Sequence, residues 1–427
     1  MSTVQPTVAS ASAPTGGRVA YLDIVRALAM VGVVLMNATA VVFTAEMTGQ
    51  REPTTFGSVL DGALNLLMSG KARAMLMVLL GVGVVLAWRS VARRGGRPLV
   101  TMLRRYAVLG LLFGIPHMLV FSGDILTVYA VTALVLAPLI PFLLRGAVRR
   151  PLWAAAAAFA VAPVFEYLVN PSTDWGLQLL PVPQTLGFFL VGVWLARRPE
   201  LSPDHTGPNR LAVPMIGIGL AGQVLGLLAL FGADLVFPRQ MDADGIPVMG
   251  ADGMPVTAPG ADLMMSLSTT LAGLGGALFY LGLVWWLLRR DGVVARSLGG
   301  LAPLGRMTLT VYLGSTAVFL LMKPFEGQIP LLGHYAVAVA YFVVVLLVAR
   351  VWTRRFRLGP VEWVWRSLTH LRPQPMRTSE TPAVAEPGAA VSVVEDPGTP
   401  GAAGHGTGRE GTVVDAPDPA DRRGPVG

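Results

Sequence analysis

A histidine and an aspartate flank a short turn in the segment FGIPHMLVFSGDILTVYA, residues 113–130. His117 precedes Ser122-Gly123 and Asp124 follows it, so a helical hairpin at this turn would bring both side chains to a similar depth near the outer face. Histidine titrates near neutral pH and can act as a general base, and a carboxylate can fix its tautomer. The pair predicts a catalytic or proton-handling site. The alternatives are a helix N-cap for Asp124 and a hydrogen-bonded packing role for His117.

Two cations, Lys71 and Arg73, lie inside an apolar run over residues 61–88. As one helix this run would reach about 42 Å, because each residue adds 1.5 Å. That exceeds the ~30 Å hydrocarbon core, so the helix must tilt, protrude or break. Ser69-Gly70 is the predicted break. Opened backbone groups beside two cations favour a lined cavity in the outer half of the membrane over side chains that snorkel to the interface.

Further polar groups lie in or beside other apolar runs. Asp23 and Arg26 in YLDIVRALAM share one face of a helix. They form either a self-neutralising ion pair or part of an inner-facing anion site. Arg306 opens a later run, in APLGRMTLTVYL, and Asn37 lies near the outer end of the first run. Charges in hydrocarbon usually face a bundle interior, which makes each of them a candidate substrate-binding residue.

The elements that carry these residues are apolar runs long enough to cross a bilayer. The 427 residues are 53% hydrophobic and only 14% charged, whereas soluble domains carry roughly 25% charged residues. A crossing needs about 20 residues. Such runs lie near 20–43, 61–88, 101–121, 124–144, 151–169, 178–196, 211–231, 263–288, 303–322 and 333–352. The sequence therefore predicts an all-α polytopic membrane protein, a bundle of about ten transmembrane helices.

Basic residues indicate the orientation of this bundle. Most of the 33 Lys and Arg residues lie in segments on the same side as the N-terminus. The outer loops hold three, Arg51, Arg239 and Lys323. Because basic loops stay in the cytoplasm, we predict a multi-pass protein of the cell (plasma) membrane with both termini cytoplasmic. This rule leaves four basic residues unexplained, namely Arg26, Lys71, Arg73 and Arg306.

Composition divides the chain into three regions. Residues 1–19 are rich in Ser, Ala, Thr and Pro, and residues 372–427 are rich in Pro, Gly and Ala. Neither can bury a core, so both are predicted to be disordered, the second as a cytoplasmic tail. Residues 20–371 form the predicted transmembrane domain, with an outer loop at 232–262.

Several site classes lack sequence support. The chain has no cysteine, which excludes disulfides, thiolate nucleophiles and Cys-ligated clusters. The four other histidines fall in predicted loops or the tail, and these are His205, His334, His370 and His405. We therefore expect no metal or redox cofactor. The basic residues lie in short loops between apolar runs, so they indicate contact with the lipid bilayer and no nucleic-acid partner.

Six stretches of the chain resemble one family of bacterial membrane proteins. They are LDIVRALAMVGVVLMN (22–37), SGKARAMLMVLLGVGV (69–84), RRYAVLGLLFGIPHMLVFSGDILTVYA (104–130), FFLVGVWLAR (188–197), LGRMTLTVYL (304–313) and RRFRLGPVEWVWRSLTH (354–370). On these stretches the chain resembles the YeiB-like family of integral membrane proteins of unknown function. The GDIL turn and the last stretch are the most specific. The family usually has Arg-Gly where this chain has Arg26-Ala27.

That family is in turn similar to a broader set of membrane acyltransferases, which includes the lysosomal heparan glucosaminide N-acetyltransferases. The resemblance implies transfer of an acyl group from cytosolic acyl-CoA, the co-substrate, to an extracytoplasmic acceptor of the cell envelope or a small molecule. It implies that Arg26 and Arg306 receive the polyphosphate of acyl-CoA.

The same resemblance assigns the remaining polar groups. Lys71 and Arg73 would line the passage or stabilise the oxyanion. His117, oriented by Asp124, would deprotonate the acceptor. Two other functions stay open: a transporter or flippase that uses the same buried charges, and a non-catalytic scaffold that docks a partner through residues 354–370.

Overall fold

The computed structural model describes residues 17–168, 179–201, 209–237, 240–242, 246, 248, 260–290 and 292–377. The predicted tail from residue 378 onward, and most of the predicted outer loop, lie outside these residues. Residues 1–16 of the predicted N-terminal segment also lie outside them. Residues 17–19 of that segment were expected to be disordered, and they instead form the first turn of a helix.

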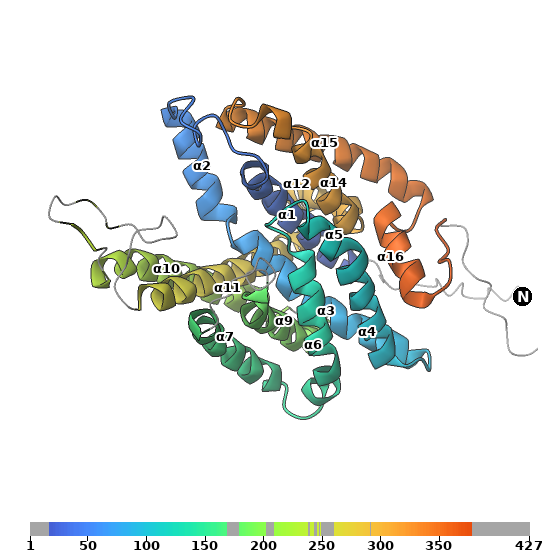
Figure 1. The fold of residues 1–427 in the computed structure, drawn as a ribbon. Coiled ribbons are helices and arrows are strands. Elements are labelled where there is room, and N and C mark those ends of the chain that lie inside the picture. Colours follow the sequence, from blue (N-terminus) through green and yellow to red (C-terminus); the bar gives the residue numbers. More distant parts are fainter. Residues whose placement is uncertain are drawn as a thin grey trace, which may run out of the picture. The chain divides into compact units, whose positions relative to one another are not determined.

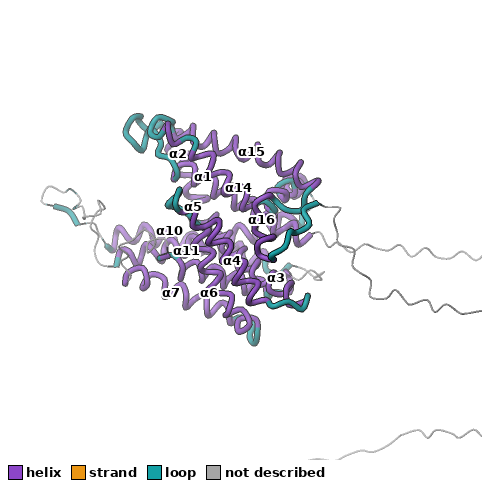
Figure 2. The backbone as a smooth tube through the Cα atoms, turned by 45° about the vertical axis from the view of Figure 1, so that its right-hand side comes forward, coloured by secondary structure: helices purple, strands orange, loops and turns teal. Residues whose placement is uncertain are grey.

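The described residues fold into helices joined by turns (Figure 1, Figure 2). The helices are α1 (Gly17–Ala40), α2 (Thr55–Met68), α3 (Lys71–Arg93), α4 (Pro98–Leu109), α5 (Ile115–Met118), α6 (Leu126–Leu144), α7 (Arg150–Leu168), α9 (Val182–Ala196), α10 (Ala212–Val236), α11 (Ala261–Leu288), α12 (Val293–Gly299), α13 (Ala302–Gly305), α14 (Thr308–Leu320), α15 (Leu331–Arg355) and α16 (Pro360–His370). The all-α class predicted from the sequence is confirmed.

Within the described residues, seven helical stretches are long and apolar enough to cross a membrane. They are Ala20–Ala40, Thr55–Arg93, Pro98–Met118, Leu126–Leu144, Ala212–Ala233, Leu263–Leu288 and Leu331–Arg355. Two shorter apolar helices, α9 and α14, occupy the predicted spans at 178–196 and 303–322. The predicted span at 151–169 is helix α7, which is not among the seven stretches. The chain is a multi-pass membrane protein.

The second span is interrupted where the sequence predicted. Helix α2 ends at Met68 and α3 begins at Lys71, and Gly70 between them has φ 71°, a conformation that favours glycine. Together the two helices form an apolar stretch of 39 residues. At 1.5 Å per residue this is about 58 Å, so the stretch extends beyond the ~30 Å core or tilts within it.

Helices α3 and α9 pack backbone to backbone at two glycines. A Cβ atom on Gly81 would lie 2.0 Å from the carbonyl oxygen of Phe189, and one on Gly192 would lie 2.1 Å from that of Val78. Small residues let membrane helices approach this closely. The contact fixes α3, which carries several candidate site residues, against the centre of the bundle.

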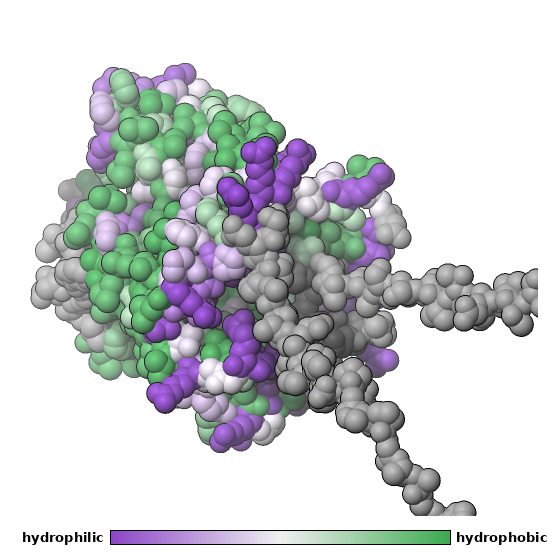
Figure 3. Space-filling view, turned by 90° about the vertical axis from the view of Figure 1, so that its right-hand side faces the viewer, coloured by the Kyte–Doolittle hydropathy of each residue, from purple (hydrophilic) through white to green (hydrophobic). Residues whose placement is uncertain are grey.

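Helix α16 packs back onto the bundle after the last long helix. The carboxylate of Glu362 accepts hydrogen bonds from the Leu309 and Thr310 amides, 2.6 and 3.1 Å away, and so caps the start of α14. The Trp365 indole donates to the Arg105 carbonyl at 2.8 Å, which joins α16 to α4. Figure 3 faces the end of the bundle that carries α16 and shows hydrophilic side chains gathered there. The segment that resembles the family most specifically is therefore anchored to two other helices.

Candidate functional site

A change of helix type sets the position of His117. Helix α4 continues through a π-helical turn, Gly110–Gly114, into the short helix α5, whose second residue is Pro116. π turns insert an extra residue and proline removes a backbone donor, so both alter the direction of the side chains that follow. A Cβ on Gly114 would lie 2.9 Å from the Thr127 backbone nitrogen. Glycine therefore lets α6 approach this turn.

His117 and Asp124 meet as the sequence predicted. The His117 Nδ1 atom lies 2.7 Å from Asp124 Oδ1, and both side chains are buried. Asp124 also accepts hydrogen bonds from the backbone amides of Leu126 and Thr127, at 3.0 and 2.8 Å. The N-cap and the histidine contact thus coexist. Because the carboxylate accepts, the neutral imidazole of His117 carries its proton on Nδ1 and its lone pair on Nε2.

The basic nitrogen of His117 faces a threonine from a distant helix. The His117 Nε2 atom lies 3.0 Å from the hydroxyl of Thr316 in α14. The ring of Tyr312, one turn earlier in α14, packs against the imidazole with ring centres 4.8 Å apart. The hydroxyl of Tyr312 is buried and donates no hydrogen bond to the described residues. The arrangement holds His117 in one orientation with its lone pair toward α14.

Arg73 lies beside this group and Lys71 does not. The Tyr129 hydroxyl donates to the Arg73 carbonyl at 3.3 Å, and Arg73 is within electrostatic range of both Tyr129 and Tyr312. Lys71 instead packs its stem against Gly276 of α11. Residues two apart on a helix point in different directions. The two cations predicted to share one cavity therefore have different neighbours.

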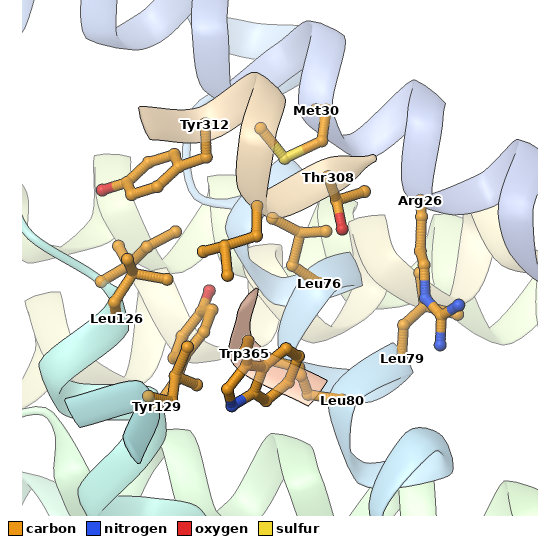
Figure 4. Close-up of a pocket in the computed structure, with 13 residues that line it drawn as sticks. Arg26, Met30, Leu76, Leu79, Leu80, Leu126, Tyr129, Thr308, Tyr312 and Trp365 are labelled. Carbon is orange, nitrogen blue, oxygen red and sulfur yellow. The ribbon is translucent and has the colours of Figure 1, made fainter. Parts of the chain in front are cut away.

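A cavity of about 100 Å³ lies inside the bundle, with Tyr129 and Tyr312 among its lining residues (Figure 4). Its walls are mainly leucine side chains of α3, α4, α6 and α14. Arg26 lies on one side of it and the two tyrosines on the other, with Trp365 of α16 between them. The cavity therefore joins a cation on α1 to the ring that packs against His117.

The remaining predicted residues lie at separate places. Arg26 pairs with Asp23 at 3.4 Å, so the predicted ion pair is present. Arg306 was expected to open a span, but it lies in the exposed turn between α13 and α14, within electrostatic range of Asp23. The Asn37 amide nitrogen is buried without a hydrogen-bond partner among the described residues.

Sequence reasoning missed or misplaced several neighbours of the site. Thr316, Tyr129 and Trp365 were not singled out, although Tyr129 lies within the quoted GDIL stretch. His334 was expected in a loop, but it is fully buried in α15, with Nδ1 2.7 Å from the Ala38 carbonyl oxygen. His370 was likewise expected in a loop and is the last residue of α16.

His370 predicts a pH dependence for the docking of α16. Desolvation and the charges of neighbouring arginines, first among them Arg105, lower the pKa of His370. The pKa of His370 in the folded protein thus lies below the usual ~6.5. The contribution of neutral His370 to the free energy of unfolding is therefore complete above about pH 6.5, and it is lost as the pH falls through the folded pKa. We expect the Tm to fall between pH 7.5 and 5.5, and to fall less in His370→Gln. Equal falls in both proteins would contradict the prediction.

Comparisons with known proteins agree with the resemblance seen in the motifs. Residues 246–372 match the family described as "Protein of unknown function (DUF418)". The chain is 26% identical over 364 residues to an uncharacterized 39.9 kDa protein in the amylase 3' region of Bacillus acidopullulyticus, covering 84% of this chain and 96% of that protein.

Two further relatives are similar over most of their length. Uncharacterized protein YxaH of Bacillus subtilis (strain 168) is 25% identical over 420 residues, 88% of this chain and 98% of the relative. Uncharacterized protein YeiB of Escherichia coli (strain K12) is 24% identical over 394 residues, 82% of this chain and 95% of the relative. The predicted resemblance is thus confirmed: this multi-pass membrane protein is similar to YeiB over most of its length and matches DUF418 over residues 246–372.

Proposed function

We propose that this protein transfers an acyl group from acyl-CoA, on the cytoplasmic side, to an acceptor hydroxyl or amine on the other side of the membrane. One observation carries the proposal: a single apolar cavity joins Arg26 to the Tyr312 ring that packs on the His117–Asp124 pair. A cation at one end suits a phosphate-bearing carrier. An oriented histidine that packs against the Tyr312 ring, beside the other end of the cavity, suits general base catalysis.

The chemistry follows from the tautomer of His117. Its Nε2 lone pair takes the proton of the acceptor hydroxyl or amine as the acceptor oxygen or nitrogen attacks the thioester carbonyl. The carbon–sulfur bond then breaks, and the imidazolium returns the proton to the leaving thiolate. Asp124 stabilises the imidazolium that forms between these steps. The Thr316 hydroxyl, now on Nε2, is displaced by the acceptor.

Two neighbouring groups would assist this reaction. The hydroxyl of Tyr312 and the charge of Arg73 can stabilise the oxyanion that develops on the carbonyl. The cavity has a volume of about 100 Å³ and mainly apolar walls. This space favours a short acyl chain.

Two measurements test the reaction. Purified protein reconstituted into vesicles is expected to transfer label from [14C]acetyl-CoA to a cell-envelope extract. Mass spectrometry of envelope glycans and lipids from cells with and without the protein is expected to show a lost acyl mass. Absence of transfer in vesicles together with unchanged envelope masses would refute the proposal.

The proposal requires about ten spans with both termini in the cytoplasm. The chain has no cysteine, so single introduced cysteines report the topology directly. We expect a membrane-impermeant maleimide to label Glu52→Cys in intact cells and to label Arg94→Cys only after permeabilisation. Both positions are exposed in turns. The reverse labelling pattern would contradict the orientation.

A transporter is the second candidate, and interrupted helices favour it. The second span breaks at Ser69-Gly70 and the third contains the π turn Gly110–Gly114. Broken helices often form binding sites for solutes or ions in transporters. Counterflow of a labelled solute across vesicles, without a covalent product, would favour transport over acyl transfer.

A further inference from the structure

Three arginines from distant parts of the chain lie around α16. Arg105 on α4 stacks its guanidinium over the Trp365 ring, 4.0 Å from the ring centre. Arg366 follows Trp365 directly on α16. Arg26 on α1 lines the same cavity as Trp365. The positive charges of Arg105 and Arg26 act on Arg366, and that of Arg26 acts on Arg105. The three guanidinium groups therefore form one electrostatic cluster.

Two nearby carboxylates, Asp23 and Glu362, offset only part of the positive charge of this cluster. Asp23 pairs with Arg26 at 3.4 Å. Glu362 is engaged by the Leu309 amide and by the amide and hydroxyl of Thr310. Two further arginines carry positive charge nearby. Arg306 is within electrostatic range of Asp23, and Arg357 is within electrostatic range of Arg366. Desolvation and the neighbouring charges lower the pKa of Arg366 to about 10. The fold thus holds like charges together with too few anions of its own.

Arginines on the cytoplasmic side of a membrane protein are common, and most of them face water or lipid. Arg105 differs from that pattern. Its Nε atom is buried and has no hydrogen-bond partner among the described residues. Its guanidinium is held in place by the indole of Trp365, whose Nε1 donates to the Arg105 carbonyl. A planar donor fixed in this way suits bidentate recognition of phosphate oxygens.

We propose that Arg26, Arg105 and Arg366 form a binding site for a phosphate-bearing polyanion at the α16 end of the cavity. The site deepens the proposed function, because it names the residues that would hold the charged part of a carrier whose acyl end enters the cavity. A soluble phosphoanhydride and an anionic lipid headgroup share this chemistry. Arg105 and Arg366 were not among the candidate residues of the sequence.

The test measures binding and needs no turnover. Full-length protein in a neutral detergent is titrated with inorganic pyrophosphate, and its Tm is recorded at low ionic strength. In a second arm, the protein is placed in nanodiscs of phosphatidylcholine with or without phosphatidylglycerol. Stabilisation by pyrophosphate identifies a soluble ligand, and stabilisation by phosphatidylglycerol alone identifies a lipid headgroup. If neither pyrophosphate nor phosphatidylglycerol stabilises the protein, the proposal is overturned, whatever the variants do.

Variants then assign the effect to the cluster. Arg105→Gln and Arg366→Gln are expected to reduce the stabilisation at least tenfold in apparent affinity, and Arg366→Lys is expected to retain part of it. Arg290→Gln is the matched control, because Arg290 also stacks on a tryptophan, with its guanidinium 3.6 Å from the Trp286 ring centre. If Arg290→Gln loses as much apparent affinity as the cluster variants do, the proposal is overturned.

This outcome is separable from that of acyl transfer. If His117→Ala still binds pyrophosphate but no vesicle preparation transfers acetyl groups, the anion site stands and the acyl transfer proposal fails. If acetyl transfer occurs while Arg105→Gln and Arg366→Gln bind pyrophosphate or phosphatidylglycerol as the wild type does, the anion site fails alone.

Discussion

Replacing His117 by alanine is expected to lower acetyl transfer in vesicles by roughly 10²–10⁴-fold, the usual contribution of a general base. The reason is geometric. Among the described residues, His117 combines a carboxylate on Nδ1 at 2.7 Å with a hydroxyl on Nε2 at 3.0 Å. Alanine removes the only group in this arrangement that can take the acceptor proton near neutral pH.

Asp124 has two roles, and its variants separate them. It caps α6 through the Leu126 and Thr127 amides and it holds the His117 tautomer. Asp124→Asn should keep the fold, because the single oxygen of asparagine can still cap α6 through the Thr127 amide. Asparagine then turns its NH2 group toward His117 Nδ1 in place of the carboxylate oxygen. It lacks the negative charge that stabilises the imidazolium. We therefore expect Asp124→Asn to retain the wild-type Tm within a few degrees, yet to lose most acetyl transfer at neutral pH.

Controls distinguish chemistry from structure at this site. His370→Gln removes a histidine of α16 and is expected to leave acetyl transfer at pH 7.5 within twofold of wild type. Thr316→Ser keeps the hydroxyl that faces His117 Nε2 and should remain active. Wild-type transfer by both His117→Ala and Asp124→Asn would refute the catalytic assignment.

The sequence predicted the parts of the site that are close along the chain. His117 and Asp124 are seven residues apart across one turn, so a hairpin alone brings them together. Thr316 is 199 residues from His117, and its position depends on how α14 packs beside α5. No local pattern encodes that packing. The same limit applies to Trp365, whose contact with Arg105 spans 260 residues.

Two local details of the sequence bear on where candidate side chains lie. Lys71 and Arg73 are two residues apart, which on a helix turns them to different directions, so a shared cavity was the weaker prediction. Arg306 follows Pro303 and Gly305, and the structure ends α13 at that glycine before α14 begins at Thr308. The π turn before His117, Gly110–Gly114, could not be predicted in this way, because no residue type in it distinguishes a π turn from an α-helix.

Composition likewise does not predict which glycines lie at a close contact between helices. Substitution of such a glycine has the second large expected effect. Gly192→Leu is expected to prevent accumulation of folded protein or to destabilise it by at least about 3 kcal/mol, the upper range for overpacked cores. The Cβ atom alone would lie 2.1 Å from the Val78 carbonyl oxygen and 2.9 Å from the Gly81 Cα atom. Two helix backbones would have to separate to admit any side chain.

Alanine variants test the same contact by the sign of the change in stability. Alanine in place of a helical glycine normally stabilises a helix by roughly 0.5–1 kcal/mol. Gly62→Ala in α2 should show that gain or no change, because nothing lies within 4 Å of its Cβ position. Gly192→Ala and Gly81→Ala should instead lower the Tm and the yield of monodisperse protein in detergent. Since α3 also supplies Leu76, Leu79 and Leu80 to the cavity wall, separation of α3 from α9 should weaken acetyl transfer as well. A Tm of Gly192→Ala equal to that of Gly62→Ala would show that α3 and α9 do not touch at these glycines.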